Sequence, residues 1–211
     1  MPHYFITGTG TGVGKTLISS ILTQALQADY WKPIQAGVES SDSMWVKSML
    51  LNPKSVVHKE AYVLNLPASP HIAAQKENIR ISIDKILEQK PNTTNDLIIE
   101  GAGGLMVPLN EKEFVIDLIQ ELHCEVIIVS RNYLGSINHS LLTANALRSR
   151  NIKVLGWIFN DEYLDYESEI VEWSKYPRIG SICKLPDINK DIINEEAIKM
   201  TDQLVQLISQ T

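Results

Sequence analysis

The sequence is poor in cysteine, in basic clusters and in long apolar runs. Its 211 residues include two cysteines, Cys124 and Cys183, far apart in apolar segments, so we expect buried thiols rather than a disulfide or a metal pair. Acidic residues outnumber lysine and arginine by 25 to 19, which argues against nucleic acid as the main partner. No apolar run approaches membrane-spanning length, so we expect no membrane partner.

The chain also lacks features that divide or export a protein. No stretch rich in proline, glycine and serine interrupts it, so we expect residues 1–211 to form a single domain with one sizeable core. A strand is predicted within three residues of Met1, which leaves no room for a signal peptide. Together with the expected reduced thiols, this favours a cytoplasmic location.

A glycine-rich stretch near the N-terminus has the most specific pattern. An apolar run at residues 5–7 leads into Gly8-Thr9-Gly10-Thr11-Gly12-Val13-Gly14-Lys15-Thr16, and a helical pattern follows over 17–28. Strand–loop–helix units of this kind bind phosphate, because converging backbone N–H groups and the helix dipole attract anions. Five residues, rather than the usual four, separate Gly8 from the Gly-Lys-Thr triplet. We expect Lys15 to reach the β- and γ-phosphates and Thr16 to hold Mg²⁺; the alternative is a turn with a surface lysine.

Two predicted strands end in charged residues. The strand over 30–34 must end near Pro33 and brings Lys32 to its carboxyl end, where open parallel sheets bind ligands; a surface lysine is an equal alternative. The strand over 96–100 delivers Glu100 to the same edge, where nucleotide-hydrolysing folds carry an acidic residue for Mg²⁺. We expect the glycines at 101, 103 and 104 to form a loop that approaches a phosphate.

Three helix starts offer further candidates. Asp42 opens a helix over 43–51, and its local pattern favours an N-cap over a metal ligand. The segment 134–140 enters a helix over 141–150 and could hold an anion such as a substrate carboxylate, although simple capping fits equally well. His71 follows Pro70 at a helix start; it is a catalytic candidate, but a polar residue there more often has no catalytic role.

Strands alternate with helices along the whole chain, with further strands predicted at 125–130, 154–160 and 179–182. This order predicts an α/β fold, in which a mostly parallel β-sheet has helices on both faces, as in P-loop NTPases. Right-handed crossovers place every strand-to-helix loop on one edge. Lys15, Lys32, Glu100, Asn138 and Asn160 are therefore expected to converge there.

The ordered motifs of the chain resemble those of the dethiobiotin synthetase family. The matching segments are residues 7–16, Lys32-Pro33, Ser41-Asp42, Ser69-Pro70-His71, residues 100–104, 134–139, Leu142-Thr143 and 156–161, which together extend over nearly the whole chain. The resemblance implies an ATP-dependent cyclo-ligase of biotin synthesis that carboxylates 7,8-diaminononanoate with CO₂ and closes the ureido ring. It also implies ATP and Mg²⁺ as cofactors and a homodimer as the working form.

The resemblance assigns roles to the matching residues. Thr16, Asp42 and Glu100 would hold Mg²⁺, which reverses the local preference for Asp42 as a cap. Lys15 and Lys32 would be catalytic, with Lys32 between the γ-phosphate and the substrate carbamate. The helix start at 135–138 would hold the substrate carboxylate across the dimer interface, and Asn160 and the loop around Pro186 would border adenine. The implied nucleotide contacts are Thr11, Gly12, Val13, Gly14, Lys15, Thr16, Asp42, Glu100, Gly101, Ala102, Gly103, Asn160, Asp161, Leu185, Pro186 and Asp187, and the implied substrate contacts are Thr11, Lys32, Ala36, Gly135, Ser136 and Asn138.

Two departures from the family pattern bear on the site. Ala36 stands where the family often has serine, so Gln35 or Thr11 would have to supply that hydrogen bond. The stretch 179–186 is longer between its glycine and its proline than the family pattern. Three alternatives stay open: a related P-loop amidoligase, a small-molecule kinase, and a nucleotide-switched regulatory ATPase. The regulatory type commonly has an additional lysine early in the phosphate loop, and positions 9–13 contain none.

Overall fold

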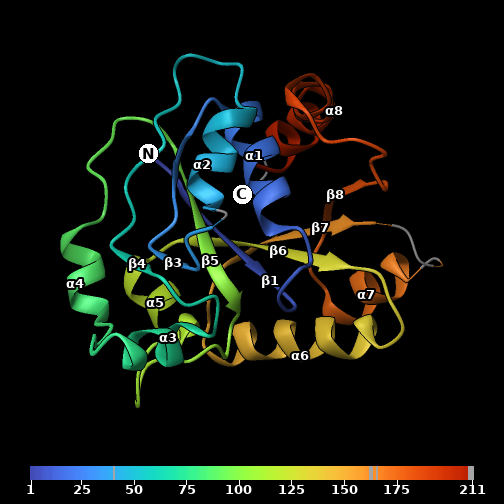
Figure 1. Cartoon of the computed structure of the whole chain (residues 1–211). Helices are drawn as coiled ribbons and strands as arrows, with labels where there is room; N and C mark the ends of the chain where they lie inside the picture. The colour runs from blue at the N-terminus through green and yellow to red at the C-terminus, as the bar shows by residue number, and fades with distance from the viewer. Residues whose placement is uncertain (40, 162–163, 165, 209–211) are drawn as a thin grey trace.

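Figure 1 presents the computed structural model, which describes residues 1–39, 41–161, 164 and 166–208. Six parallel strands form the main sheet in the order β2-β5-β1-β6-β7-β8. Both faces of a parallel sheet are covered by helices, which explains the nearly continuous apolar runs of its strands. The predicted parallel sheet is therefore confirmed. The strands are β1 His3–Gly8, β2 Asp29–Trp31, β5 Leu97–Gly104, β6 Glu125–Arg131, β7 Val154–Asn160 and β8 Arg178–Ile182.

Helices cover both faces of this sheet (Figure 1). One face carries α1 Lys15–Leu26, α2 Asp42–Met49 and α8 Lys190–Ile208, and the other carries α5 Val115–Leu122, α6 Ser136–Ser149 and α7 Glu167–Ser174. The shorter α3 Pro70–Lys76 and α4 Ile83–Glu88 contribute to the same core layer as α5 and α6. Neighbouring residues on a strand point to opposite faces, so Phe5 belongs to this layer and Ile6 to the layer under α1.

The predicted strand over 30–34 is divided in the structure. β2 ends at Trp31, and Ile34 starts a second, two-stranded parallel sheet in which β3 Ile34–Ala36 pairs with β4 Tyr62–Leu64. Pro33 lies between the two strands, where a residue without an N–H group cannot continue a ladder. Lys32 is therefore at the carboxyl end of β2, as predicted.

The glycines after Glu100 form the end of β5 instead of the predicted loop. Gly104 pairs with Gly8 of β1, and a Cβ atom on Gly104 would lie 3.2 Å from the Gly8 carbonyl oxygen. A Cβ atom on Gly101 would lie 2.6 Å from the Phe5 ring. These glycines permit a close approach of β5 to β1, which is a packing role.

The outer edge of β2 is covered by the segment 56–58. The Tyr30 N–H group donates to the Val56 carbonyl at 2.9 Å, and the His58 N–H group donates to the Tyr30 carbonyl at 2.8 Å. The Asp29 carboxylate lies behind this pairing and accepts hydrogen bonds from the Val56 N–H group and the Asn95 side chain, both at 2.9 Å. β2 is thus held on both sides.

The two cysteines differ from each other. Cys124 is buried, as expected, but Cys183 is exposed because it follows the last residue of β8, where the chain leaves the sheet. The expectation of two buried thiols was wrong for Cys183. Among the described residues, no helix is long and apolar enough to cross a bilayer.

Candidate active site

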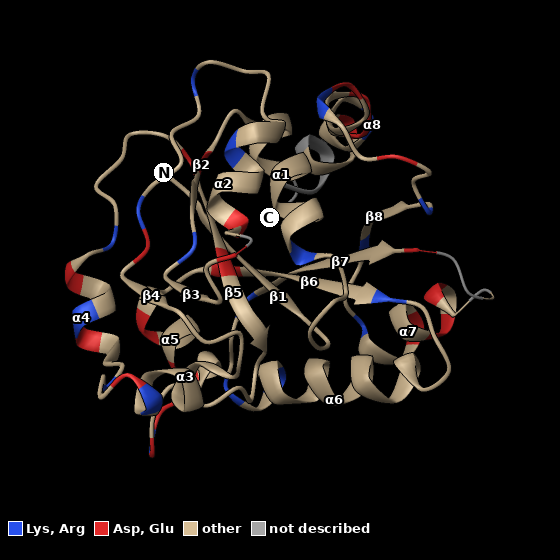
Figure 2. Cartoon of the chain, viewed as in Figure 1, with Lys and Arg blue, Asp and Glu red and all other residues tan. Residues whose placement is uncertain are grey.

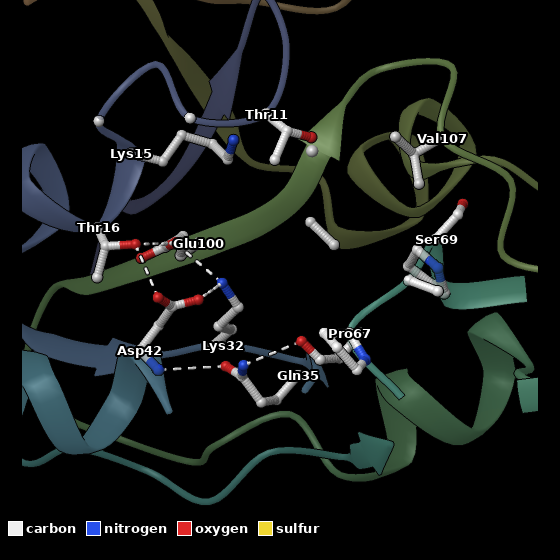
Figure 3. Close-up of a pocket in the computed structure, with 17 residues that line it drawn as sticks. Thr11, Lys15, Thr16, Lys32, Gln35, Asp42, Pro67, Ser69, Glu100 and Val107 are labelled. Carbon is white, nitrogen blue, oxygen red and sulfur yellow. Dashed lines mark hydrogen bonds and ion pairs between the residues drawn. The ribbon is translucent and has the colours of Figure 1, made fainter. Parts of the chain in front are cut away.

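The phosphate loop and the carboxyl ends of β2 and β5 border a cavity of about 720 Å³ (Figure 3). Its volume lies in the range typical of small-molecule sites. The residues that line it come from the phosphate loop, from the segment that runs through β3 to the start of α2, from the loop before α3 and from the end of β5 with its following turn. They are Thr11, Gly12, Gly14, Lys15, Thr16, Lys32, Gln35, Ala36, Asp42, Pro67, Ala68, Ser69, Pro70, Glu100, Ala102, Gly103 and Val107.

Three oxygen-bearing side chains meet at one end of the cavity. The Thr16 hydroxyl lies 2.8 Å from Glu100 Oε1 and 3.1 Å from Asp42 Oδ1. A hydroxyl has one proton, so it can donate to only one of these carboxylates at a time. Ser41, not Asp42, caps helix α2 by accepting a hydrogen bond from the Met44 N–H group at 3.3 Å. Asp42 therefore points its carboxylate into the site, as the resemblance implied.

These oxygen atoms suit Mg²⁺. Hydroxyl and carboxylate oxygens are the protein ligands that Mg²⁺ prefers, and one or two carboxylates usually suffice because water and phosphate fill the other positions. Among the described residues, no group of three or more His, Cys, Asp and Glu side chains forms a site made of protein ligands alone. Thr16, Asp42 and Glu100 fit a magnesium ion that arrives with a nucleotide.

Lys32 connects the two carboxylates. Its Nζ atom donates to Glu100 Oε1 at 3.0 Å and also to Asp42 Oδ2 (Figure 3). Burial by itself would lower the pKa of Lys32, but the two carboxylates outweigh it and hold the pKa above its usual value. Lys32 is therefore a buried ammonium group, held in its charged form by the two carboxylates, at the edge of the cavity.

Lys15 has the opposite electrostatic setting. Burial lowers its pKa to about 8, with the Lys32 charge acting in the same direction and Glu100 opposing it. Its Nζ atom donates to the Gly10 carbonyl at 2.9 Å, within the phosphate loop itself. A bound phosphate would replace this carbonyl as the partner of the ammonium group and favour its charged form.

Two further polar residues belong to the site: Tyr30, which no sequence pattern indicated, and Gln35, which was expected only as a hydrogen-bond donor in place of the missing serine. The Tyr30 hydroxyl donates to Glu100 Oε2 at 2.8 Å, and burial, reinforced by Glu100, raises the pKa of Tyr30 well above its usual value. Gln35 donates to the Gly37 carbonyl at 2.9 Å and accepts from the Asp42 N–H group at 3.3 Å. The Tyr30 contact joins two segments distant in the sequence, so no local pattern indicates it, whereas both partners of Gln35 lie within a few residues of it.

Gln35 therefore does not offer a free amide in place of the serine that Ala36 replaces. Both ends of its side chain are engaged by backbone groups, and its side chain is buried. Thr11, the other candidate, is exposed and lines the cavity. The lining also includes the apolar side chains of Pro67, Ala68 and Val107, which no sequence pattern indicated apart from the neighbouring Ser-Pro-His motif.

Several predicted residues lie outside this cavity. Asn160, at the end of β7, contacts the phosphate loop: its side-chain amide donates to the Val13 carbonyl at 2.9 Å. Asp161 pairs with Arg131 at 2.6 Å. Gly101 packs against Phe5 on the opposite face of the sheet, as described above. Leu185 packs against the core under α1, and Pro186 and Asp187 are exposed in the loop after β8.

The start of α6 and His71 also lie apart from the cavity lining. Ser136 is buried, while Gly135 and Asn138 are exposed at the first turn of α6, which begins five residues before the predicted helix. His71 Nδ1 lies 3.0 Å from the Ser69 hydroxyl, so its contact is with its own helix start. Thr11, Gly12, Gly14, Lys15, Thr16, Lys32, Ala36, Asp42, Glu100, Ala102 and Gly103 are the predicted residues that the structure brings together in one cavity.

Similar proteins identify the family. A family model described as an AAA domain matches residues 3–191. The ATP-dependent dethiobiotin synthetase BioD of Cytophaga hutchinsonii is 48% identical over 205 residues, which cover 96% of this chain and 98% of that protein. The protein of the same name from Christiangramia forsetii is 50% identical over 206 residues, which cover 97% of this chain and 98% of that protein.

Solved structures give a more distant likeness. The cell division ATPase MinD of Pyrococcus furiosus superposes with a TM-score of 0.61 over 98% of this chain and all of that chain, at 12% identity. At that identity the likeness is evidence for the fold alone, and it agrees with the predicted nucleotide-binding α/β fold. The curated relatives are far more similar and extend over nearly the full length, so the chain belongs to the dethiobiotin synthetase family.

Proposed function

We propose that this protein is an ATP-dependent cyclo-ligase that converts 7,8-diaminononanoate, CO₂ and ATP into dethiobiotin, ADP and phosphate. One observation carries the proposal: the buried ammonium group of Lys32 lies beside a phosphate loop and between two carboxylates suited to Mg²⁺. The full-length relatives that bear the name dethiobiotin synthetase support the choice of substrate.

The proposed reaction has three steps. One amine of the substrate attacks CO₂ and loses a proton, which gives a carbamate. A carbamate oxygen then attacks the γ-phosphorus of ATP, and ADP leaves, which gives a carbamic–phosphoric anhydride. The second amine attacks the carbonyl carbon of this anhydride, phosphate leaves with the electron pair of the broken C–O bond, and loss of a proton completes the ureido ring.

The side chains of the site match the charges that develop in this sequence. Phosphoryl transfer depends mainly on positioning and charge stabilisation. Lys32 would bind the carbamate and the γ-phosphate oxygens together, and Lys15 with the phosphate-loop N–H groups would bind the β- and γ-phosphates. Bound Mg²⁺ would neutralise charge on the phosphates; Thr16, Asp42 and Glu100 would hold it.

The opposite side of the cavity suits the substrate. Pro67, Ala68 and Val107 give an apolar wall for an alkyl chain, and Thr11 offers a hydroxyl near the phosphate loop. Ala36 contributes no polar atom, so we propose that Thr11 provides the hydrogen bond that a serine would otherwise make. Adenine contacts from Asn160, Asp161 and residues 185–187 are part of the same proposal.

The working form is proposed to be a homodimer formed through α6. Helix α6 has no charged residue before Arg148, and Figure 2 shows it almost free of charge colouring. Exposed apolar side chains lie on and beside it: Leu142 is 59% exposed, Met106 58% and Leu134 81%. In this arrangement, the first turn of α6 from one copy, with Gly135, Ser136 and Asn138, would bind the substrate carboxylate in the cavity of the other.

Phosphate release from MgATP tests the function. The purified protein is expected to release phosphate at a high rate only when diaminononanoate and bicarbonate are both present, with a ureido product detected by mass spectrometry. Release that needs the diamine but not bicarbonate would favour an amidoligase or a small-molecule kinase. Release that responds to neither, but rises with a protein partner, would favour a regulatory ATPase.

A cytoplasmic location is also proposed. The chain has only two cysteines, which are far apart in the sequence, and a low cysteine content is typical of proteins from a reducing compartment. Labelling of both thiols in protein that is freshly isolated under acid quench would support this location.

A further inference from the structure

Glu100 presents two oxygen atoms to different partners. Oε1 accepts hydrogen bonds from Thr16 at 2.8 Å and from Lys32 at 3.0 Å, both within the cavity. Oε2 faces away from them and accepts a hydrogen bond from the Tyr30 hydroxyl at 2.8 Å. Glu100 is 1% exposed and Tyr30 is fully buried, so water does not compete for this contact.

Tyr30 reaches Glu100 because of the strand geometry. Tyr30 lies on β2 and pairs with Ile98 of β5, two residues before Glu100. Side chains two residues apart on a strand point to the same face, so Tyr30 and Lys32 both approach the carboxylate from the neighbouring strand. Lys32 donates to Oε1 of Glu100 and Tyr30 donates to Oε2, which leaves the carboxylate little freedom to rotate.

We propose that Tyr30 is a positioning residue that fixes the Glu100 carboxylate so that Oε1 stays directed at the metal. This inference rests on the proposed role of Glu100 toward Mg²⁺. Without the Tyr30 hydroxyl, Oε2 would be buried without a donor, and the carboxylate would turn to share the donors on its other side. Outer-shell hydrogen bonds of this kind commonly change metal affinity by about 10-fold to 100-fold.

The test measures how Mg²⁺ changes nucleotide affinity. ADP binding is measured by calorimetry in EDTA and in excess Mg²⁺, for the wild type, Tyr30→Phe and Tyr62→Phe. Phe keeps the ring and removes only the hydroxyl. Tyr62 is a matched control, because it is also buried and its hydroxyl also makes one hydrogen bond, from the Ser82 N–H group at 3.2 Å.

We expect Tyr30→Phe to bind ADP normally in EDTA and to lose about 10-fold of the affinity gained with Mg²⁺. Tyr62→Phe should keep the full gain. The EDTA titration shows that the nucleotide site is folded, and a purely structural role for Tyr30 would lower the melting temperature without changing the Mg²⁺ gain. An unchanged gain in Tyr30→Phe, or an equal loss in Tyr62→Phe, would overturn the inference.

An error in the proposed Mg²⁺ site itself would give a different result. If the wild type itself binds ADP equally well with and without Mg²⁺, the metal role of Thr16, Asp42 and Glu100 is wrong, and the inference falls with it. A wild-type gain that persists in Tyr30→Phe overturns the role of Tyr30 alone.

Discussion

Lys32 shows how one residue gains its properties from its surroundings. Its ammonium group is buried, yet the carboxylates of Asp42 and Glu100 keep it charged. In the proposed complex with nucleotide and Mg²⁺, these carboxylates would gain a second cation as a partner, and the lysine would be free to turn toward the phosphates. The residue is therefore suited to meet the negative charge that grows during phosphoryl transfer.

Lys32→Ala is expected to lower kcat by about 100-fold or more and to change the KM for ATP little, because the lost interaction strengthens in the transition state. Steady-state phosphate release with both co-substrates present measures this. Lys47→Ala, an exposed lysine of α2, is the control and should behave like the wild type. Near-normal turnover in Lys32→Ala would refute the catalytic role.

For single residues, the sequence indicated those that belong to a motif and missed those whose contacts form only in the folded chain. Lys15 and Thr16 follow from the phosphate-loop pattern, and Glu100 from its place after an apolar strand. Asp42 needed the family resemblance, because its local pattern favours an N-cap over a metal ligand. Tyr30 makes its contact across two strands that are joined only in three dimensions, so no spacing in the sequence could reveal it.

Among the elements, the phosphate loop places the tightest steric limit on one of its glycines. Gly14 has a φ of 97° and precedes α1, and a Cβ atom there would lie 2.1 Å from the amide nitrogen of Asn160. Gly10, at the tip of the same loop, has open space around the corresponding position. The two glycines offer a comparison within one loop.

Gly14→Ala is expected to destabilise the protein by about 1–3 kcal/mol, because it adds a steric clash to a left-handed backbone. Gly10→Ala should stay within about 1 kcal/mol of the wild type. Urea unfolding followed by circular dichroism measures both. Equal effects of the two substitutions would show that the contact with Asn160 is unimportant.

Asp29 joins β2 to two connecting loops. Burial alone would raise the pKa of Asp29, but hydrogen bonds from Asn95, Val56 and Thr93 outweigh it and hold the pKa below its usual value. A carboxylate with a lowered pKa contributes stability above its unfolded-state pKa of about 4, and this contribution is lost as the pH falls through the folded-state value.

Asp29→Asn should therefore lower the free energy of unfolding by about 1–3 kcal/mol at pH 7, and by less at pH 3. Urea titrations at the two pH values measure the difference. Glu111→Gln, which breaks an exposed pair with Arg80, is the control and should leave the curve unchanged at pH 7. A deficit in Asp29→Asn that is the same at both pH values would contradict the electrostatic explanation.

The elements that the sequence predicted best are the long ones. The strands of the main sheet have apolar runs that no helical period explains. β3 and β4 have three residues each, too few for a periodic pattern, and their pairing joins segments about 30 residues apart. The extension of β5 through its glycines follows from tertiary contact with β1, which overrides the turn preference of glycine.

For the whole molecule, the proposed dimer predicts complementation between two damaged chains. Lys32→Ala removes a group from the cavity, and Asn138→Asp places negative charge where the partner's substrate carboxylate would bind. Co-expression of the two variants should give dimers of which about half are mixed. In a mixed dimer, the cavity of the Asn138→Asp copy meets the intact α6 of the Lys32→Ala copy, so one of its two sites is intact. About one quarter of wild-type activity should therefore return.

Activity of the co-expressed chains is compared with that of each variant expressed alone. Leu142→Asp, which places charge on the exposed face of α6, should yield monomers by light scattering and abolish the recovery. Recovery no greater than the mean of the two variants would contradict a site shared between copies.

The covered edge of β2 has a consequence for how the protein behaves in concentrated solution. A terminal strand with unpaired N–H and carbonyl groups is a template for strand addition by other molecules. Here the segment 56–58 occupies that template, and Asp29 fastens it in place. Strand β2, which ends directly before Lys32, is thereby shielded from β-pairing with other molecules. We therefore expect the segment 56–58 to reduce aggregation of the protein.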